Sequence, residues 1–325
     1  MKTDTAQKIL EYISTNTQAS PKDLYNLLGL SPRAVFKQLN KLSKNNLIRR
    51  IGNPPKVYYT LTTKELPKNP IDLDEQTTRL INEHFYYISP IGQEKIGLAG
   101  FQAWCQKQNL DTVKTAREYI LTLQKYSRYK KDGLIDGMHK MSSTFDHVWL
   151  DKIFYMDFYA IERFGKTKLG QLLLLAKSSQ NRKQMGALIE MIAPPVKHII
   201  KKFSIDGVGF IPPTVKRELQ FMNELKKHLP IKQKQLSIIK TKTSVIVAQK
   251  TLNKLQDRIE NARQTIIVED KTPFDNILLI DDAVGSGATL NETAAQIKHK
   301  KLCHGKIIGL AIVGSFKGFD VISEV

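Results

Sequence analysis

The sequence predicts an α/β part at the C-terminal end, with a parallel sheet and flanking helices, and a small N-terminal part of three helices and a β-hairpin. Residues 277–280 (ILLI) leave no polar face, which is typical of a buried parallel strand. Serine–proline pairs near the N-terminus predict helix starts. A polar, proline-rich stretch, TKELPKNPIDLDEQ, separates the two parts. We therefore expect domains at 1–65 and 150–325, joined by a linker and helical segment at 66–149.

The bulk composition points to a soluble protein with a polyanionic partner. The 325 residues carry 50 Lys plus Arg against 31 Asp plus Glu, a formal net charge of +19. This excess favours nucleic acid as a partner. The apolar runs are too short to span a membrane and the first residues lack a signal-peptide core, so we expect no membrane contact and a cytoplasmic protein. Cys105 and Cys303 lie far apart and predict neither a disulfide framework nor a zinc site.

The first 65 residues predict three short helices and then a hairpin. Apolar residues recur at helical spacing in TAQKILEYISTN, while Ser20-Pro21 opens a second helix that closes at Gly29. Ser31-Pro32 opens a third helix at once. The stretches LIRRI and KVYYTLT have the composition of strands, and the turn GNPP between them keeps both prolines away from ladder hydrogen bonds.

The third helix, from Ser31 to Asn45, places Val35, Leu39 and Leu42 on one face and basic residues on the other. The whole stretch resembles winged helix-turn-helix DNA-binding domains. This resemblance implies that the third helix enters the major groove and that the wing contacts phosphates. A small dimerisation or protein-binding module is the alternative. The implied nucleic-acid-binding residues are Arg33, Lys37, Gln38 and Lys41 on the helix, and Arg49, Arg50 and Lys56 on the wing.

Residues 150–205 contain an incomplete match to a nucleotide-binding motif. Gly165-Lys166-Thr167 matches the end of a nucleotide-binding P-loop, but Ala160 stands where that motif needs its first glycine, and we expect no apolar strand before it. We therefore predict no P-loop here. The following stretch DGVGFIPPTVKRE predicts a strand and a basic loop, and KIIGLAIVG near the C-terminus predicts another buried strand.

The most informative stretch is ILLIDDAVGSGATL, residues 277–290. Asp281 and Asp282 follow the predicted strand, at the end where open α/β sheets bind ligands. The small residues after them let backbone N–H groups approach an anion, and a helix predicted to begin at Thr289 adds its N-terminus. The two carboxylates suit ribose hydroxyls or a hydrated magnesium ion. An ordinary acidic turn is the alternative.

This combination resembles the signature of type I phosphoribosyltransferases, which implies 5-phosphoribosyl-1-diphosphate (PRPP) and Mg²⁺ as ligands. By the resemblance, Asp281 and Asp282 hold the ribose hydroxyls and meet the metal indirectly, through PRPP and water. The sequence departs from the family at Gly285-Ser286, where Thr-Thr or Thr-Ser is usual, so one hydroxyl contact to phosphate is missing. The implied 5-phosphate loop comprises Val284, Gly285, Ser286, Gly287, Ala288 and Thr289.

Two further stretches resemble the competence protein F branch of these enzymes. Its diphosphate loop corresponds to Pro212, Pro213, Lys216 and Arg217, whose positive charge suits a diphosphate leaving group. Its flexible hood corresponds to IIKTKTSVIVAQKTLNKLQDRIENA, in which a lid would exclude water from PRPP. The alternative for the hood is a solvated amphipathic helix with Leu252, Leu255 and Ile259 as its buried stripe. The implied hood residues are Lys240, Lys242, Gln249, Arg258 and Asn261.

Two function classes remain open. In the first, the protein transfers a phosphoribosyl group, with Asp281, Asp282, Lys216 and Arg217 as catalytic residues, and nucleic acid gates the reaction. The architecture resembles anti-phage toxins encoded beside retron reverse transcriptases, which implies DNA or an RNA–DNA hybrid, a reverse transcriptase complex and a homodimer as partners. In the second, the site only senses PRPP and changes DNA affinity, as in purine repressors. Fold alone does not choose between them.

Overall fold

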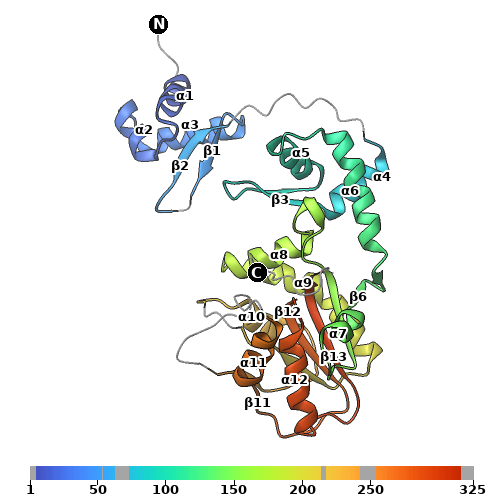
Figure 1. Ribbon diagram of the computed structural model, residues 1–325. Coiled ribbons are helices and arrows are strands. Elements are labelled where there is room, and N and C mark those ends of the chain that lie inside the picture. Colours follow the sequence, from blue (N-terminus) through green and yellow to red (C-terminus); the bar gives the residue numbers. More distant parts are fainter. Residues whose placement is uncertain (1–4, 53, 63–72, 214–216, 242–253, 316–325) are drawn as a thin grey trace. The chain divides into compact units, whose positions relative to one another are not determined.

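The computed structural model describes residues 5–52, 54–62, 73–213, 217–241 and 254–315 (Figure 1). The chain divides into two compact units, Met1–Ile71 and Asp72–Val325, which are described separately below. Strands β5 (Lys130–Lys131) and β6 (Leu134–Asp136) belong to the larger unit, although they lie in the segment 66–149 for which the sequence predicted a linker and a helical segment.

The first unit has the predicted three helices and hairpin: α1 (Thr5–Asn16), α2 (Pro21–Leu28), α3 (Pro32–Lys44), β1 (Ile48–Ile51) and β2 (Tyr58–Leu61). The predicted helix signals are present. The Ser20 and Ser31 hydroxyls accept backbone N–H groups of the first turns of α2 and α3, and Gly29 ends α2 in the left-handed conformation. The strands pair in antiparallel register. A core that includes Ile9, Leu24 and Leu39 holds these elements together.

The second unit begins with a helical part: α4 (Glu75–His84), the antiparallel pair β3 (Tyr86–Ile88) and β4 (Glu94–Ile96), α5 (Gly97–Lys107) and α6 (Thr112–Ser127). Aromatic rings fill its interior. The Phe85 ring lies 4.9 Å from that of Phe101 and 5.3 Å from that of Tyr119, both edge to face, and Trp104 packs at 5.7 Å from Phe164. Trp104 is thus a packing residue.

A seven-stranded mixed sheet forms the centre of the second unit, in the order β5-β6-β7-β13-β12-β8-β9. The strands from β7 to β9 run parallel, whereas β5 and β6 pair antiparallel. Their bounds are Lys130–Lys131 (β5), Leu134–Asp136 (β6), Lys152–Phe158 (β7), Gly207–Phe210 (β8), Lys234–Gln235 (β9), Ile277–Val284 (β12) and Ile307–Gly314 (β13). The expectation of no strand before Gly165 was therefore wrong, because β7 precedes it.

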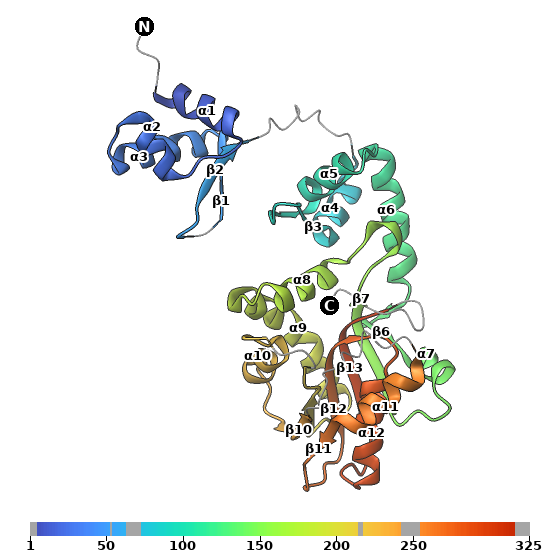
Figure 2. The same ribbon diagram turned by 60° about the vertical axis from the view of Figure 1, so that its left-hand side comes forward.

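Helices cover both faces of the sheet, as Figure 2 shows. One face packs on α8 (Lys168–Ser178), α9 (Arg182–Lys202) and α10 (Phe221–His228), and the other on α11 (Leu255–Thr265) and α12 (Ala288–His299). In β12, Leu278 and Ile280 pack into the core on the face covered by α8, α9 and α10. Ile277 and Leu279 pack into the core on the face covered by α11 and α12. Burial on both faces is the physical reason for the unbroken apolar run of this strand. The remaining elements are α7 (Met138–Thr144), a 3₁₀ turn (Glu162–Phe164), and the antiparallel pair β10 (Ile238–Lys240) and β11 (Ile266–Val268).

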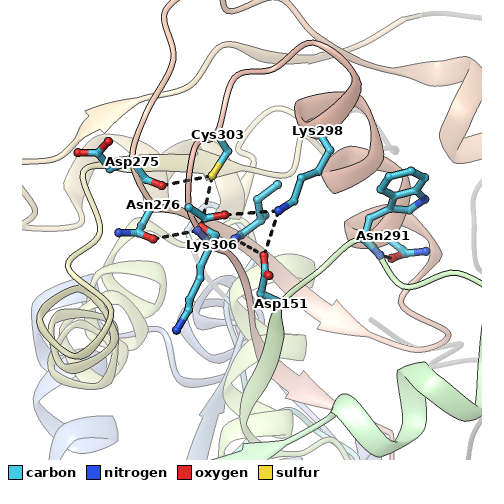
Figure 3. A network of polar contacts seen from close by, with 10 residues as sticks. Asp151, Asp275, Asn276, Asn291, Lys298, Cys303 and Lys306 are labelled. Atoms are coloured by element: carbon cyan, nitrogen blue, oxygen red, sulfur yellow. Dashed lines mark hydrogen bonds and ion pairs between the residues drawn. The ribbon is translucent and has the colours of Figure 1, made fainter.

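A polar network closes the sheet at the N-terminal ends of β12 and β13 (Figure 3). One carboxylate oxygen of Asp151 accepts the Ile307 backbone N–H at 2.8 Å and faces the Lys298 ammonium at 3.4 Å. The Asn276 side-chain oxygen accepts the Lys306 N–H at 2.9 Å, and the Cys303 thiol lies 3.5 Å from the backbone oxygens of Asp275 and Lys306. Because parallel strands share one direction, the C-terminal strand ends lie at the opposite edge.

Candidate ligand site and nucleic-acid interface

Strand β12 carries both predicted aspartates, but it does not end before them. The strand continues to Val284, because Asp281, Ala283 and Val284 pair with residues of β13. On its other side the pairing with β8 stops at Ile280, which accepts the Ile211 N–H at 2.9 Å. The prediction that the strand ends at Ile280 was thus wrong by four residues on the β13 side. The aspartates still lie just beyond the point where the pairing with the neighbouring strand β8 ends.

The sheet topology places a switch point between β8 and β12. From β8 the chain continues to β9 on one side, whereas from β12 it continues to β13 on the other side. Connections that leave two adjacent parallel strands in opposite directions open a crevice outside the strand ends, and ligands of α/β proteins bind in such crevices. Residues after Phe210 and around Asp282 border this crevice.

The two neighbouring carboxylates have unequal surroundings. Asp282 forms an ion pair with Lys177 of α8 at 2.9 Å, and both side chains are less than one-fifth exposed, at 17% and 18%. Asp281 accepts the Asp282 backbone N–H at 2.8 Å. Burial and the negative charge of Asp282 raise the pKa of Asp281 to about 7, although Lys177 and Lys240 oppose this shift. Asp281 therefore exchanges a proton near neutral pH.

The loop after β12 approaches its neighbours closely. Gly287 has φ +89°, and a Cβ at this position would lie 2.4 Å from the Met141 sulfur. Ser286 is buried, and its hydroxyl accepts the Ala288 N–H at 3.3 Å. Helix α12 starts at Ala288, one residue before the predicted start at Thr289. Val284, Gly285 and the following small residues thus lead directly into a helix N-terminus, as a phosphate-binding loop requires.

The predicted diphosphate loop follows β8. Pro212 and Pro213 come directly after the strand and are partly buried, while Lys216 lies outside the described residues. The Arg217 guanidinium donates to the backbone oxygen of Lys177, and the Leu219 N–H donates to the Gln180 side chain at 3.1 Å. The segment 217–219 is therefore attached to the C-terminal end of α8.

The predicted hood, residues 238–262, contains β10 and most of α11. Lys240 on β10 is partly buried and Arg258 on α11 is buried, and burial lowers the pKa of each. Lys242, Gln249 and Leu252 lie outside the described residues. Leu255 and Ile259 pack against the main core, as the amphipathic-helix alternative predicts.

The segment directly after the predicted hood is attached to α12 by side chains. The Arg263 guanidinium pairs with Glu292 at 3.0 Å. The Gln296 side chain bonds to the backbone of β11, accepting from Val268 at 3.1 Å and donating to Ile266 at 2.6 Å. The helix that starts at the proposed phosphate loop thus also holds the segment that follows the predicted hood.

Lys177 is the site residue that the sequence reasoning missed. It is separated from Asp282 by 105 positions, so no local spacing connects them. The available signal was its position directly after the apolar run LLLLA in α8. The stretch Gly165-Lys166-Thr167, which matches the end of a P-loop, has a structural role. Thr167 caps α8, and the Lys166 ammonium lies 5.6 Å from the centroid of the Tyr159 ring.

The nucleic-acid residues predicted on α3 share its exposed face. Arg33, Lys37 and Lys41 are exposed, opposite the buried stripe that faces the core, whereas Gln38 is half-buried at its border. The helix contains no acidic residue. Its outer face can therefore contact phosphates without repulsion.

The wing divides its predicted residues between two faces. Arg49 and Arg50 are consecutive in β1, so their side chains leave opposite faces of the hairpin. Arg50 and Lys56 are exposed, while the Arg49 Nε is buried with no hydrogen-bond partner in the described part of the chain. Arg50 and Lys56 are the better placed phosphate contacts.

Comparison with known proteins supports the first unit. Residues 2–49 match the family model for winged helix-turn-helix DNA-binding domains, and the first unit is a domain of this kind. No curated protein matches the chain. A solved structure of the ferric uptake regulator from Francisella tularensis with iron is similar over 34% of this chain and 76% of that chain, with 19% identity and a TM-score of 0.19.

Two features are missing from the described residues. No helix among them is long and apolar enough to cross a membrane. They also contain no group of three or more His, Cys, Asp or Glu residues that could hold a metal ion.

Proposed function

We propose that the second unit binds PRPP together with Mg²⁺ in the crevice between β8 and β12, and that the first unit binds nucleic acid. One observation carries the proposal. Two adjacent aspartates lie at a topological switch point and are followed by a tight loop that leads into a helix N-terminus.

The residues present fit a phosphosugar. Gly287 lets the loop pack closely against Met141, and the loop leads its backbone N–H groups into the N-terminus of α12, where a phosphate is favoured. Asp281 and Asp282 accept hydrogen bonds from the ribose hydroxyls. When bound, Mg²⁺ neutralises charge on the diphosphate, and the carboxylates meet it through PRPP and water. By the resemblance, Pro213, Arg217, Lys240 and Arg258 would serve the diphosphate side of the ligand.

The proposed reaction is phosphoribosyl transfer. An acceptor nucleophile forms a bond to C1 of the ribose, the bond from C1 to the diphosphate oxygen breaks, and the acceptor gives its proton to solvent. The diphosphate leaves with the bonding electron pair, and nearby cations stabilise its growing charge. By the resemblance, the predicted hood, residues 238–262, would act as a lid that excludes water during this step.

A PRPP sensor without turnover is the second candidate. Gly285 supports it, because a glycine replaces a hydroxyl contact to phosphate that the resembling enzymes have. Presence of a winged helix-turn-helix in the same chain fits a regulator whose DNA affinity changes with PRPP. It equally fits a toxin-like effector that a retron-type RNA–DNA hybrid, with its reverse transcriptase, holds inactive in the cytoplasm.

Calorimetric titration with PRPP and Mg²⁺, followed by chromatography of the same sample for diphosphate, tests the proposal. We expect saturable binding. Diphosphate release establishes transfer or hydrolysis, whereas binding without release, with and without duplex DNA or an RNA–DNA hybrid, favours the sensor. Absence of PRPP binding under all these conditions would refute the ligand assignment.

A further inference from the structure

Lys177 lies where three separate parts of the second unit meet. Its side chain reaches Asp282 on β12, and its backbone oxygen accepts from Arg217 in the segment after β8. Just after the end of α8, the Gln180 side-chain oxygen accepts the Leu219 N–H at 3.1 Å. The C-terminal end of α8 and the residues just after it thus contact Asp282 in β12 and the segment 217–219.

The ion pair between Lys177 and Asp282 is not explained by stability. Both side chains are largely removed from water, at 18% and 17% exposed, and the cost of desolvating two charges offsets much of their attraction. Asp282 also adjoins a second carboxylate, Asp281. A lysine kept at this position supplies a positive charge beside the predicted sugar contacts.

An ammonium group has three N–H donors and no acceptor, so a single carboxylate contact leaves donors for an anion. Lys177 contacts Asp282 through its ammonium group and the segment containing Arg217 through its backbone oxygen. In the proposed binding mode, the diphosphate is the anionic group of PRPP that lies next to the segment containing Arg217.

We propose that Lys177 is a ligand-contacting residue whose ammonium group binds the diphosphate of PRPP while Asp282 turns to the ribose hydroxyls. This inference rests on the proposed function. It adds a residue from α8 to a site otherwise formed by β12, the segment after β8 and the hood.

The test compares full-length wild type with Lys177→Met and Lys177→Arg by calorimetry. The titrants are PRPP, magnesium diphosphate and ribose 5-phosphate. We expect Lys177→Met to weaken diphosphate and PRPP binding about 10- to 100-fold, the range for a lost charged hydrogen bond, and to change ribose 5-phosphate affinity less than about twofold. Lys177→Arg should restore part of the loss. Lys183→Met, an exposed lysine on the next helix, is the matched control.

The outcomes separate this inference from the proposed function. Equal losses for ribose 5-phosphate and diphosphate would mean that Lys177 acts only by holding Asp282, and unchanged diphosphate affinity would remove it from the site. If Lys177→Met does not fold, as judged by its thermal unfolding midpoint, Lys177→Gln takes its place with the same expectations. A wild type that binds none of the three ligands would refute the proposed function itself.

Discussion

The two units of the chain carry their charged residues in opposite ways. Residues 1–71 contain 12 Lys and Arg against 4 Asp and Glu, and the predicted contacts on α3 are exposed along one helix face. Residues 72–325 are closer to balance, with 38 against 27, and their candidate site combines partly buried charges from α8, β10 and β12.

This difference teaches what each surface is suited to bind. Exposed cations act on a polyanion through a long-range field that salt screens. Charges removed from water have shifted pKa values and fixed partners, which suits one small ligand of defined geometry. The following predictions test whether the two units differ in this way.

The largest effect is expected from Asp281→Asn combined with Asp282→Asn. Loss of both ribose contacts should weaken PRPP binding at least about 100-fold, because each charged hydrogen bond contributes about 1.5–3 kcal/mol. Nucleic-acid binding should stay unchanged. Calorimetry and a DNA-binding titration on the same preparation measure both. Unchanged PRPP affinity in a folded double variant would contradict the site assignment.

The reverse separation is expected from Arg33→Ala, Lys37→Ala and Lys41→Ala combined. Affinity for duplex DNA should fall on the order of 10- to 100-fold, and the slope of log affinity against log salt should shrink by about 0.9 for each lost phosphate contact. PRPP binding should persist. Lys8→Ala, an exposed lysine on α1, is the control. If the salt slope does not change, α3 is not the phosphate-contacting helix.

Gly287→Ala tests the loop before α12. A side chain there combines the left-handed backbone with a Cβ at 2.4 Å from the Met141 sulfur, so we expect a loss of about 1–3 kcal/mol in the free energy of unfolding and weaker phosphate binding. Chemical denaturation measures the first effect. Gly186→Ala in α9, where no atom lies within 4 Å of the added Cβ, should stabilise by up to about 1 kcal/mol. Equal effects of the two substitutions would argue against a constrained loop.

The smallest effect is a pH dependence from Asp281. Its pKa is about 7 in the folded chain and near 4 in the unfolded chain, so between these values the folded state binds more protons. The free energy of unfolding should therefore fall as pH rises from about 4 to 7 through this group. Asp281→Asn should abolish that fall and be relatively more stable at pH 8. If the stability difference between wild type and Asp281→Asn is constant from pH 4 to 8, the pKa of Asp281 is not raised in the folded chain.

Several elements followed from the sequence because their signals are local. Ser20, Ser31 and Gly29 cap helices through backbone groups within four positions, and helical spacing alone puts Val35 and Lys37 on different faces. The same holds for Ile277 to Ile280, whose apolar character requires burial on both sheet faces. Such signals predicted the winged helix-turn-helix and the strand with its two aspartates.

The tertiary structure decided what depends on distant partners. β5 and β6 have only two and three residues, so their strand form comes from pairing next to β7 rather than from their own pattern. The extension of β12 to Val284 needs β13. The sequence by itself determined that Asp281 and Asp282 follow the buried apolar run 277–280, but only folding brings Lys177 to Asp282, because an ion pair between residues 105 positions apart has no spacing rule.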